Sequence, residues 1–344
     1  MRSVVKIINK YDLGTAVEDF SRVVMLGSNE NPYEPSNSVK KAYIESLNLI
    51  NRYPDASYSA LKCSLAEYVG VNEENIAVGC GTSELISCVC NSLIEELDRV
   101  VIPVPSYTLY AIYSMLRNAD IVFLRFENYE VDADVIAEYK PKLTFICSPN
   151  NPTGNTVDID TIAKIAEYSE YVVVDEAYAE FCGESCVDLI SDYKNLVILR
   201  TLSKFFGLAG LRVGYAVASK EIAEALEKVR LPFAISSIAV RVAIAAIKSL
   251  DYYKSIRDKI VKERERVFEE LLKINFLKPY PSKANFILAK VLKNGITKKL
   301  AERGIVVRDV TGLIGLEGEH IRITIGKPEE NKRLLKALKE ISQT

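Results

Sequence analysis

Four short apolar runs of this sequence are each followed at once by polar residues that could do chemistry. The polar groups are an amide, a carboxylate, a phenol, a lysine, an arginine and several small hydroxyls: Asn151, Asp175, Tyr178, Lys204, Arg212, Thr82, Ser83, Thr201 and Ser203. If the runs are parallel strands, these residues meet at one edge of the sheet, where such sheets bind ligands. Singly, each has a simpler explanation as a helix cap or a turn residue. Together they indicate a single site.

The residue types at this predicted site suit a cofactor that carries an aldehyde, a pyridine nitrogen, a phenolate oxygen and a phosphate. Lys204 can form a Schiff base, and burial and cationic neighbours would lower its pKa. Asp175 can keep a pyridine nitrogen protonated, so that the ring draws electrons from a substrate α carbon. The amide of Asn151 and the phenol of Tyr178 suit the ring oxygen. Hydroxyls, Arg212 and the helix start after Gly81 suit a phosphate.

The elements that must position these residues are predicted from hydrophobicity. Continuous apolar runs indicate strands buried on both faces, and most are separated by roughly 20 to 25 residues, enough for a helical crossover. The seven runs are Ile76–Val78, Val100–Ile102, Ile121–Leu124, Thr144–Cys147, Tyr171–Val174, Val197–Leu199 and Val213–Ala218. The interval between the last two is shorter, so one strand there is expected to run antiparallel. The fold class is therefore α/β, with a mostly parallel seven-stranded sheet between helices.

The sequence after Pro232 predicts a second, smaller domain of α+β type. Residues 234–273 read as one long helix or two abutting helices, the candidate connection between domains. Short strands and a closing helix follow, at Asn285–Ala289, Gly304–Arg308, His320–Ile325 and Pro328–Ile341. We expect an N-terminal arm at 1–28, a large cofactor-binding domain at 29–235 and a small domain at 236–344.

Composition excludes several other classes of function. With 44 Lys plus Arg against 46 Asp plus Glu, the net charge of −2 gives no bulk attraction for nucleic acid or an anionic membrane. One histidine in 344 residues, His320, argues against imidazole chemistry. The seven cysteines show no zinc-site spacing, so no metal site is predicted and reduced thiols of a cytoplasmic protein are expected. Neither a membrane-spanning run nor a signal peptide is recognisable.

Motifs along almost the whole chain resemble the pyridoxal-phosphate aminotransferases of fold type I, and most closely their histidinol-phosphate aminotransferase family. The matching segments are SNENPYEP at 28–35, RYPD at 52–55, GCGTSEL at 79–85, SPNNPTG at 148–154, VVVDEAYAEF at 172–181, RTLSKFFGLAGLRVGY at 200–215, ANFIL at 284–288 and IRITIG at 321–326. The order and spacing of SPNNPTG, DEAY and SK-x7-R are specific for the cofactor, pyridoxal 5'-phosphate, and less so for the substrate.

The resemblance implies a role for each motif residue. Lys204 would hold the cofactor as a Schiff base and move the proton in transamination, Asp175 would pair with the ring nitrogen, Asn151 and Tyr178 would contact the ring oxygen, and Tyr107 would stack on the ring. The phosphate would be held by Gly81, Thr82, Ser83, Thr201, Ser203 and Arg212, and by Tyr53 from the other subunit. The last role implies a homodimer with shared active sites.

Substrate recognition is expected from Arg322 and Arg308, with Asn151 beside them. The resemblance places both arginines at the anionic group of substrates such as glutamate, 2-oxoglutarate and a phosphorylated amino alcohol. The simpler alternative is that Arg308 pairs with Asp309 on the surface. The family's proline-containing N-terminal segment is replaced here by YDLGTAVEDF, in which Tyr11 could cover the substrate, and His320 is expected to be structural.

Other functions stay open at this stage. Threonine-phosphate decarboxylases share closely similar motifs, and an aromatic aminotransferase is a third possibility. A Rossmann oxidoreductase would need a third glycine after Gly79-x-Gly81, which the sequence lacks. A binding module without a cofactor is a further alternative.

Overall fold

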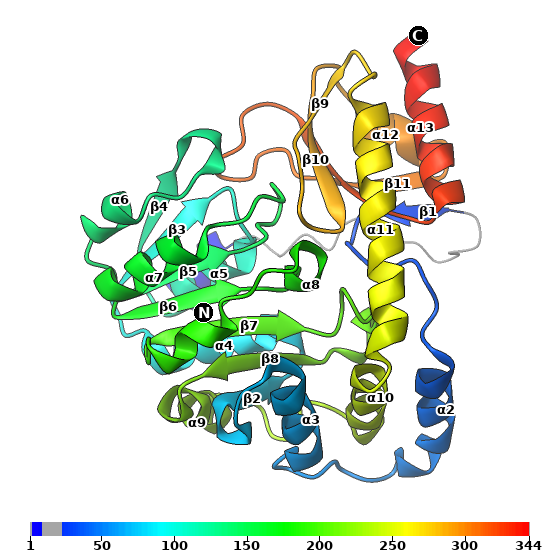
Figure 1. Ribbon diagram of the computed structural model, residues 1–344. Helices are drawn as coiled ribbons and strands as arrows, with labels where there is room; N and C mark the ends of the chain where they lie inside the picture. Colours follow the sequence, from blue (N-terminus) through cyan, green and yellow to red (C-terminus); the bar gives the residue numbers. More distant parts are fainter. Residues whose placement is uncertain (1, 9–22, 344) are drawn as a thin grey trace.

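In the computed structural model, which describes residues 2–8 and 23–343, the strands form two sheets (Figure 1). The larger has seven strands in the order β2-β8-β7-β6-β5-β3-β4. Their bounds are β2 Ile76–Gly79, β3 Arg99–Val104, β4 Asp120–Arg125, β5 Leu143–Cys147, β6 Tyr171–Asp175, β7 Leu196–Thr201 and β8 Gly214–Ala218. Only β8 runs antiparallel to its neighbours, β2 and β7. The predicted seven-stranded, mostly parallel sheet is confirmed, including its one antiparallel strand.

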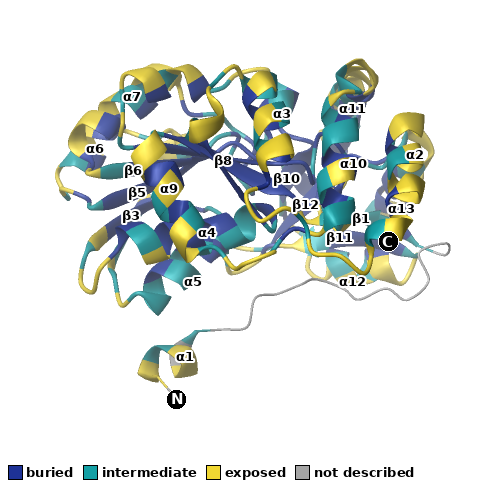
Figure 2. Cartoon of the chain, turned by 90° about the horizontal axis from the view of Figure 1, so that it is seen from below, coloured by how far each residue is buried: buried dark blue, intermediate teal, exposed yellow. Residues whose placement is uncertain are grey.

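Helices cover both faces of this sheet because its strands are buried on both sides. In β6, Val172 and Val174 pack into one apolar cluster and Val173 packs into the other, as alternating side chains must. Figure 2 shows α3, α6 and α7 on one face and α4, α5 and α9 on the other. The bounds of these helices are α3 Ser59–Val69, α4 Gly81–Leu93, α5 Thr108–Leu116, α6 Ala133–Ala137, α7 Ile159–Tyr168 and α9 Lys220–Val229.

Two abutting helices, α10 (Ser237–Ile247) and α11 (Leu250–Leu271), connect the large sheet to the rest of the chain. The Ser236 side chain caps α10 by accepting a hydrogen bond from the Ala239 N–H at 3.1 Å. Figure 1 shows α11 running from α10 beside the large sheet to the strands of the second sheet. The prediction for residues 234–273 is confirmed in its two-helix form.

The second sheet has five strands in the order β1-β11-β12-β10-β9. Their bounds are β1 Val24–Leu26, β9 Leu277–Pro279, β10 Phe286–Val291, β11 Ile305–Asp309 and β12 His320–Thr324. Helices α12 (Ile296–Ala301) and α13 (Pro328–Gln343) accompany it, and α1 (Ser3–Ile7), α2 (Asn37–Glu45) and α8 (Ala179–Cys182) complete the longer helices of the described residues. The three predicted strands and the closing helix are present.

Strand β1 was not predicted, and it joins the N-terminal segment to the second sheet. It runs parallel to β11, with Val24 opposite Ile305. Residues 24–26 of the expected arm are thus part of the second sheet, while the domain boundaries at 28 and 235 stay a prediction. Across the described residues, no helix is both long enough and apolar enough to cross a membrane.

Candidate active site

The carboxyl ends of the central strands open into a cavity of about 800 Å³. Strands β5, β6 and β7 lie side by side, with Asp175 opposite Cys147 on one side and Leu199 on the other, so the segments that follow them meet at this edge. The cavity is lined by Thr82, Ser83, Tyr107, Asn151, Asp175, Tyr178, Thr201, Ser203, Lys204, Arg212, Arg308 and Arg322. Of the predicted site residues, only Gly81 and Tyr53 do not line it.

Lys204 has the properties of a reactive amine. Its Nζ donates a hydrogen bond to the Ser28 carbonyl oxygen at 2.8 Å. Burial, followed by the nearby positive charge of Arg322, lowers the pKa of Lys204 to about 8. A substantial fraction of this amine is therefore neutral near pH 8, which is the form that attacks an aldehyde or accepts a proton.

Asp175 is buried at the end of β6 and is held by two donors. The Tyr110 hydroxyl donates to Oδ2 at 2.7 Å, and the Ala177 N–H donates to Oδ1 at 3.0 Å. Burial raises the pKa of Asp175 to about 6, against the lowering effect of these two hydrogen bonds. Tyr110 is itself fixed by stacking on Phe145 and by an edge contact with Tyr107. The carboxylate is thus oriented and prepared to pair with a cation.

We expect Tyr110→Phe to shift the pH dependence of cofactor binding. Removing the hydroxyl takes away a donor to the ionised form of Asp175, so the pKa of this carboxyl rises by about one further unit. The acid limb of the profile of cofactor affinity against pH, measured by titrating the cofactor-free protein, should move to higher pH by a similar amount, with folding retained. Tyr113→Phe, on the same helix α5, is the matched control and should leave the profile in place. An unchanged acid limb in Tyr110→Phe would contradict this role.

Asn151 and Tyr178 lie together with a residue that was not predicted, Asn29. The Nδ2 of Asn29 donates to the Tyr178 hydroxyl at 2.9 Å, and the Oδ1 of Asn151 accepts from Arg322 at 2.6 Å. Burial raises the pKa of Tyr178, so the phenol keeps its proton at neutral pH and can donate it in a hydrogen bond. An amide and a phenol therefore lie in the cavity with Asp175, as the sequence predicted.

Hydroxyl groups and a guanidinium that could bind an anion cluster near the start of α4 and the end of β7. The Thr201 hydroxyl donates to Ser203 Oγ at 3.0 Å, and Arg212 donates to the same Ser203 oxygen at 3.4 Å. Arg212 has a left-handed backbone conformation, φ 55°, which is strained for a residue with a Cβ. Gly81 lies directly against its guanidinium, because a Cβ at 81 would clash with Arg212 Nη2.

Gly214 allows the close approach of β8 to the start of α4. A Cβ at this position would lie 2.5 Å from the carbonyl carbon of Gly81 and 2.6 Å from the nitrogen of Thr82. Both contacts are with backbone, which cannot rotate away as a flexible side chain can. Glycine at 214 therefore keeps the first N–H groups of α4 at the cavity, where they suit a phosphate.

The substitution Gly214→Ala is expected to weaken the binding of pyridoxal 5'-phosphate by about tenfold or more, because the added methyl displaces the start of α4. Equilibrium titration of the cofactor-free protein measures this affinity. Gly70→Ala is the control, since Gly70 does not line the cavity and a Cβ there meets nothing within 4 Å. Wild-type affinity in Gly214→Ala would mean that the start of α4 does not hold the phosphate.

Arg308 and Arg322 face one another on adjacent antiparallel strands. They are a register pair of β11 and β12, and both line the cavity. Arg322 is largely buried and also donates to the Gly27 carbonyl oxygen at 2.8 Å. Like charges directly opposite each other destabilise a sheet, so this pair indicates a site for an anion. Asp309 lines the same cavity as Arg308, so the role of Arg308 at an anionic group stays a prediction.

Three other residues singled out in the sequence lie elsewhere. Tyr53 is 79% exposed, outside the cavity of its own chain, and stacks on Phe233 with ring centroids 4.5 Å apart. His320 is buried in β12, where its ring stacks on Tyr280, away from the cavity. Tyr11 and the segment 11–20 fall outside the described residues.

Sequence reasoning missed Asn29, Tyr110 and Gly214, which contact predicted site residues. Each lies in or beside a segment that was noted: SNENPYEP contains Asn29, Tyr110 comes three residues after Tyr107, and Gly214 comes two residues after Arg212. These positions could have been suspected, but their partners could not be named from spacing.

The fold and this site define the class of protein, a fold type I aminotransferase. The chain belongs to the aminotransferase class I and II family, whose sequence model matches residues 21–338. It is 62% identical, over 99% of its length and 100% of the relative, to histidinol-phosphate aminotransferase 2 of Archaeoglobus fulgidus.

Solved structures agree with this membership. A histidinol-phosphate aminotransferase from Clostridium acetobutylicum is 30% identical with a TM-score of 0.86, covering 93% of this chain and 99% of its own. One from Sinorhizobium meliloti, in complex with pyridoxal-5'-phosphate, is 27% identical with a TM-score of 0.85, covering 94% and 92%. The predicted family, fold and enzyme class are confirmed, which excludes the Rossmann oxidoreductase and the binding module without a cofactor.

Proposed function

We propose that this protein is a pyridoxal-phosphate-dependent histidinol-phosphate aminotransferase of histidine biosynthesis. It would transfer an amino group between histidinol phosphate and 2-oxoglutarate in a ping-pong reaction. The observation that carries the proposal is one cavity in which Lys204 and Asp175 lie with the cross-strand pair Arg308 and Arg322. The first two suit amino-group chemistry, and the guanidinium pair suits the phosphate of one substrate and a carboxylate of the other. The 62% identical relative supports this substrate.

The residues present fit pyridoxal 5'-phosphate. The close packing of Gly81 and Gly214 leaves the start of α4 open as a cradle for the phosphate, with Arg212 beside it. Thr82, Ser83, Thr201 and Ser203 would complete the phosphate site; Asp175 would hold the ring nitrogen, Asn151 and Tyr178 the ring oxygen, and Tyr107 the ring face. Bound there, the cofactor supplies a protonated ring that draws electrons from the substrate α carbon.

The chain's own residues perform the remaining tasks. Lys204 would hold the aldehyde carbon covalently until the substrate amine replaces it, and its freed Nζ would take the proton from the α carbon as a general base. A pKa near 8 suits this role, because the amine is available without being a strong base. Asp175 would keep the ring nitrogen paired, and a cation beside this carboxylate would lower its pKa. Arg322 and Arg308 would orient the substrate by its anionic end.

A half-reaction comparison tests the substrate. The cofactor-loaded protein is mixed separately with histidinol phosphate, threonine phosphate, phenylalanine and glutamate, and the cofactor absorbance and the release of carbon dioxide are followed. We expect histidinol phosphate and glutamate to convert the cofactor without carbon dioxide. Release of carbon dioxide from threonine phosphate would indicate the decarboxylase instead, and fastest conversion by phenylalanine would indicate an aromatic aminotransferase.

The proposal includes a homodimer in which Tyr53 reaches the phosphate of the partner subunit. Exposed apolar side chains occur in two segments that meet where Tyr53 stacks on Phe233: Tyr43, Ile44, Leu47, Ile50 and Tyr53 in the first, Val229, Leu231 and Phe233 in the second. Such a surface is typical of an interface. Sedimentation at assay concentration checks the oligomeric state, and a fully active monomer would refute the proposed dimer. Cytoplasmic location is also proposed, because the seven cysteines are all unpaired.

A further inference from the structure

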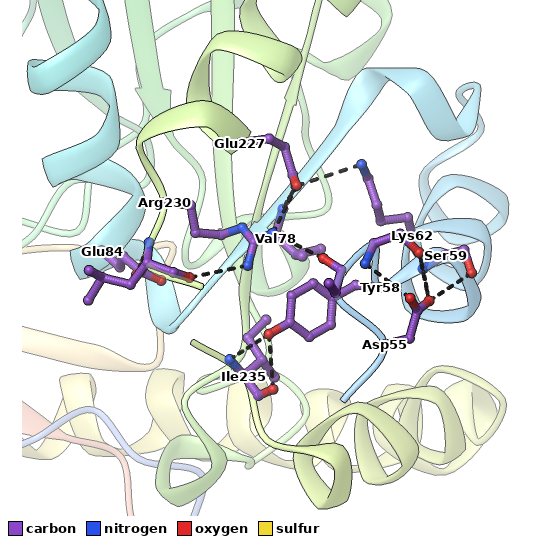
Figure 3. A network of polar contacts seen from close by, with 12 residues as sticks. Asp55, Tyr58, Ser59, Lys62, Val78, Glu84, Glu227, Arg230 and Ile235 are labelled. Atoms are coloured by element: carbon purple, nitrogen blue, oxygen red, sulfur yellow. Dashed lines mark hydrogen bonds and ion pairs between the residues drawn. The ribbon is translucent and has the colours of Figure 1, made fainter. Parts of the chain in front are cut away.

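Glu84 lies in the first turn of α4, outside the cavity, and accepts two backbone hydrogen bonds from different segments. Its Oε2 accepts from the Cys80 N–H at 2.5 Å, directly before the phosphate-binding turn. Its Oε1 accepts from the Leu231 N–H at 3.4 Å, in the segment after α9 (Figure 3). One carboxylate therefore joins the start of α4 to a segment almost 150 residues away.

Arg230, next to Leu231, ties the same segment to the start of α3. Its guanidinium lies over the Tyr58 ring at 4.8 Å and donates to the Ala56 carbonyl oxygen at 3.4 Å. It also pairs with Glu227 at 3.0 Å, and Glu227 accepts from the Val78 N–H of β2 at 3.3 Å. Figure 3 shows these contacts as one network around Tyr58.

The network ends at the surface that carries Tyr53. The Tyr58 hydroxyl bonds to both the N–H and the carbonyl oxygen of Ile235, each at 3.1 Å. The Ser237 hydroxyl donates to the Arg52 carbonyl oxygen at 3.1 Å, directly before Tyr53. Phe233, between Leu231 and Ile235, stacks on the Tyr53 ring. The phosphate-binding turn and the Tyr53–Phe233 surface are thus held by continuous polar contacts between three segments.

We propose that Glu84 is a positioning residue that holds the phosphate-binding turn of α4 and couples it to the Tyr53–Phe233 surface. This inference rests on the proposed cofactor and homodimer. The phosphate of a bound cofactor would fix the turn, and Glu84 would hold Leu231 against that turn. The Tyr53–Phe233 surface, which would contact the second copy of this chain, would then be ordered together with the turn. Cofactor binding and subunit association should therefore strengthen one another.

The positioning role is tested by a pair of ligands that differ only in the phosphate. Equilibrium binding of pyridoxal 5'-phosphate and of pyridoxal to the cofactor-free protein is compared in wild type and Glu84→Gln. Because glutamine can accept through only one oxygen, we expect about tenfold weaker binding of the phosphorylated ligand and unchanged binding of pyridoxal. Glu84→Ala should also weaken the binding of pyridoxal 5'-phosphate without changing that of pyridoxal, and by a larger factor than Glu84→Gln. Equal weakening of both ligands, or no change in either, overturns the role.

The coupling is tested by sedimentation with and without cofactor. In wild type, the cofactor should lower the dimer dissociation constant by a measurable factor, the ratio of the constants without and with cofactor. In Glu84→Gln this factor should be smaller by about fivefold or more. The matched control is Glu74→Gln, which removes an exposed ion pair with Lys220 and should leave the factor unchanged. An unaltered factor in Glu84→Gln overturns the coupling. A wild type that stays monomeric refutes the proposed dimer and the coupling together. The comparison of pyridoxal 5'-phosphate with pyridoxal still tests the positioning role in that case.

Discussion

Replacing Lys204 by alanine is expected to lower the rate of amino-group transfer by at least about 10³-fold, because this residue would serve both as the covalent anchor and as the general base. Among the described residues, no amine other than Lys204 lines the cavity. Folding should be retained, since the hydrogen bond that is lost, from Nζ to the Ser28 carbonyl oxygen, joins a single pair of residues at the cavity. Transamination rate and cofactor absorbance would be measured together.

Borohydride reduction adds an independent readout for Lys204. In the wild type it should fix the cofactor to Lys204 and remove the near-visible absorption band, and mass analysis of the labelled peptide locates the attachment. Lys204→Ala should bind the cofactor without becoming labelled by it. Lys332→Ala, an exposed position on α13, is the control and should behave as wild type. A Lys204→Ala protein that transaminates at the wild-type rate would refute the assignment.

Asp175→Asn should lower activity by about 10²–10³-fold, because a neutral amide cannot hold the ring nitrogen in its protonated form. The same change should stabilise the cofactor-free protein. Burial raises the pKa of Asp175 from 3.8 to about 6, so this carboxyl binds a proton more tightly in the folded protein than in the unfolded chain. Stability is then lost as pH rises from 3.8 through 6, and the penalty of about 3 kcal/mol is complete above that range.

Denaturant unfolding of the cofactor-free protein at two pH values checks this sign. At pH 8, Asp175→Asn should be more stable than wild type by up to about 3 kcal/mol, and at pH 4 the difference should nearly vanish. Asp188→Asn, at an exposed position, should change stability little at either pH. A lower stability of Asp175→Asn at pH 8 would show that the two hydrogen bonds to the carboxylate outweigh the cost of its burial.

The sequence predicts most of the fold because the strands of the large sheet are buried on both faces. Each such strand is an apolar run, and even the antiparallel β8 is indicated by the short interval before it. Strands β1 and β9 could not be predicted, since three residues carry no periodicity and their place comes from pairing, as with Val24 opposite Ile305. Register of this kind depends on segments far apart in the chain.

The residues of the candidate site likewise divide into those that the sequence predicts and those that depend on distant contacts. Asp175, Asn151 and Lys204 are predictable because each follows a strand, and strand ends in a parallel sheet meet. Asn29 and Tyr110 are not, because they hydrogen-bond to partners 149 and 65 residues away, and no spacing in the sequence shows such a pair. The opposition of Arg308 and Arg322 likewise needed the antiparallel register of β11 and β12.

The arginine pair has a practical consequence for handling the enzyme. Arg308 and Arg322 line the same cavity and are the groups that would bind the anionic end of the substrate, so a small buffer anion could occupy the same place. Phosphate or sulfate buffers should therefore raise the melting temperature while competing with the substrate. Kinetic constants measured in such buffers would understate affinity for substrate, so assays belong in buffers whose acid component is a zwitterion or a cation.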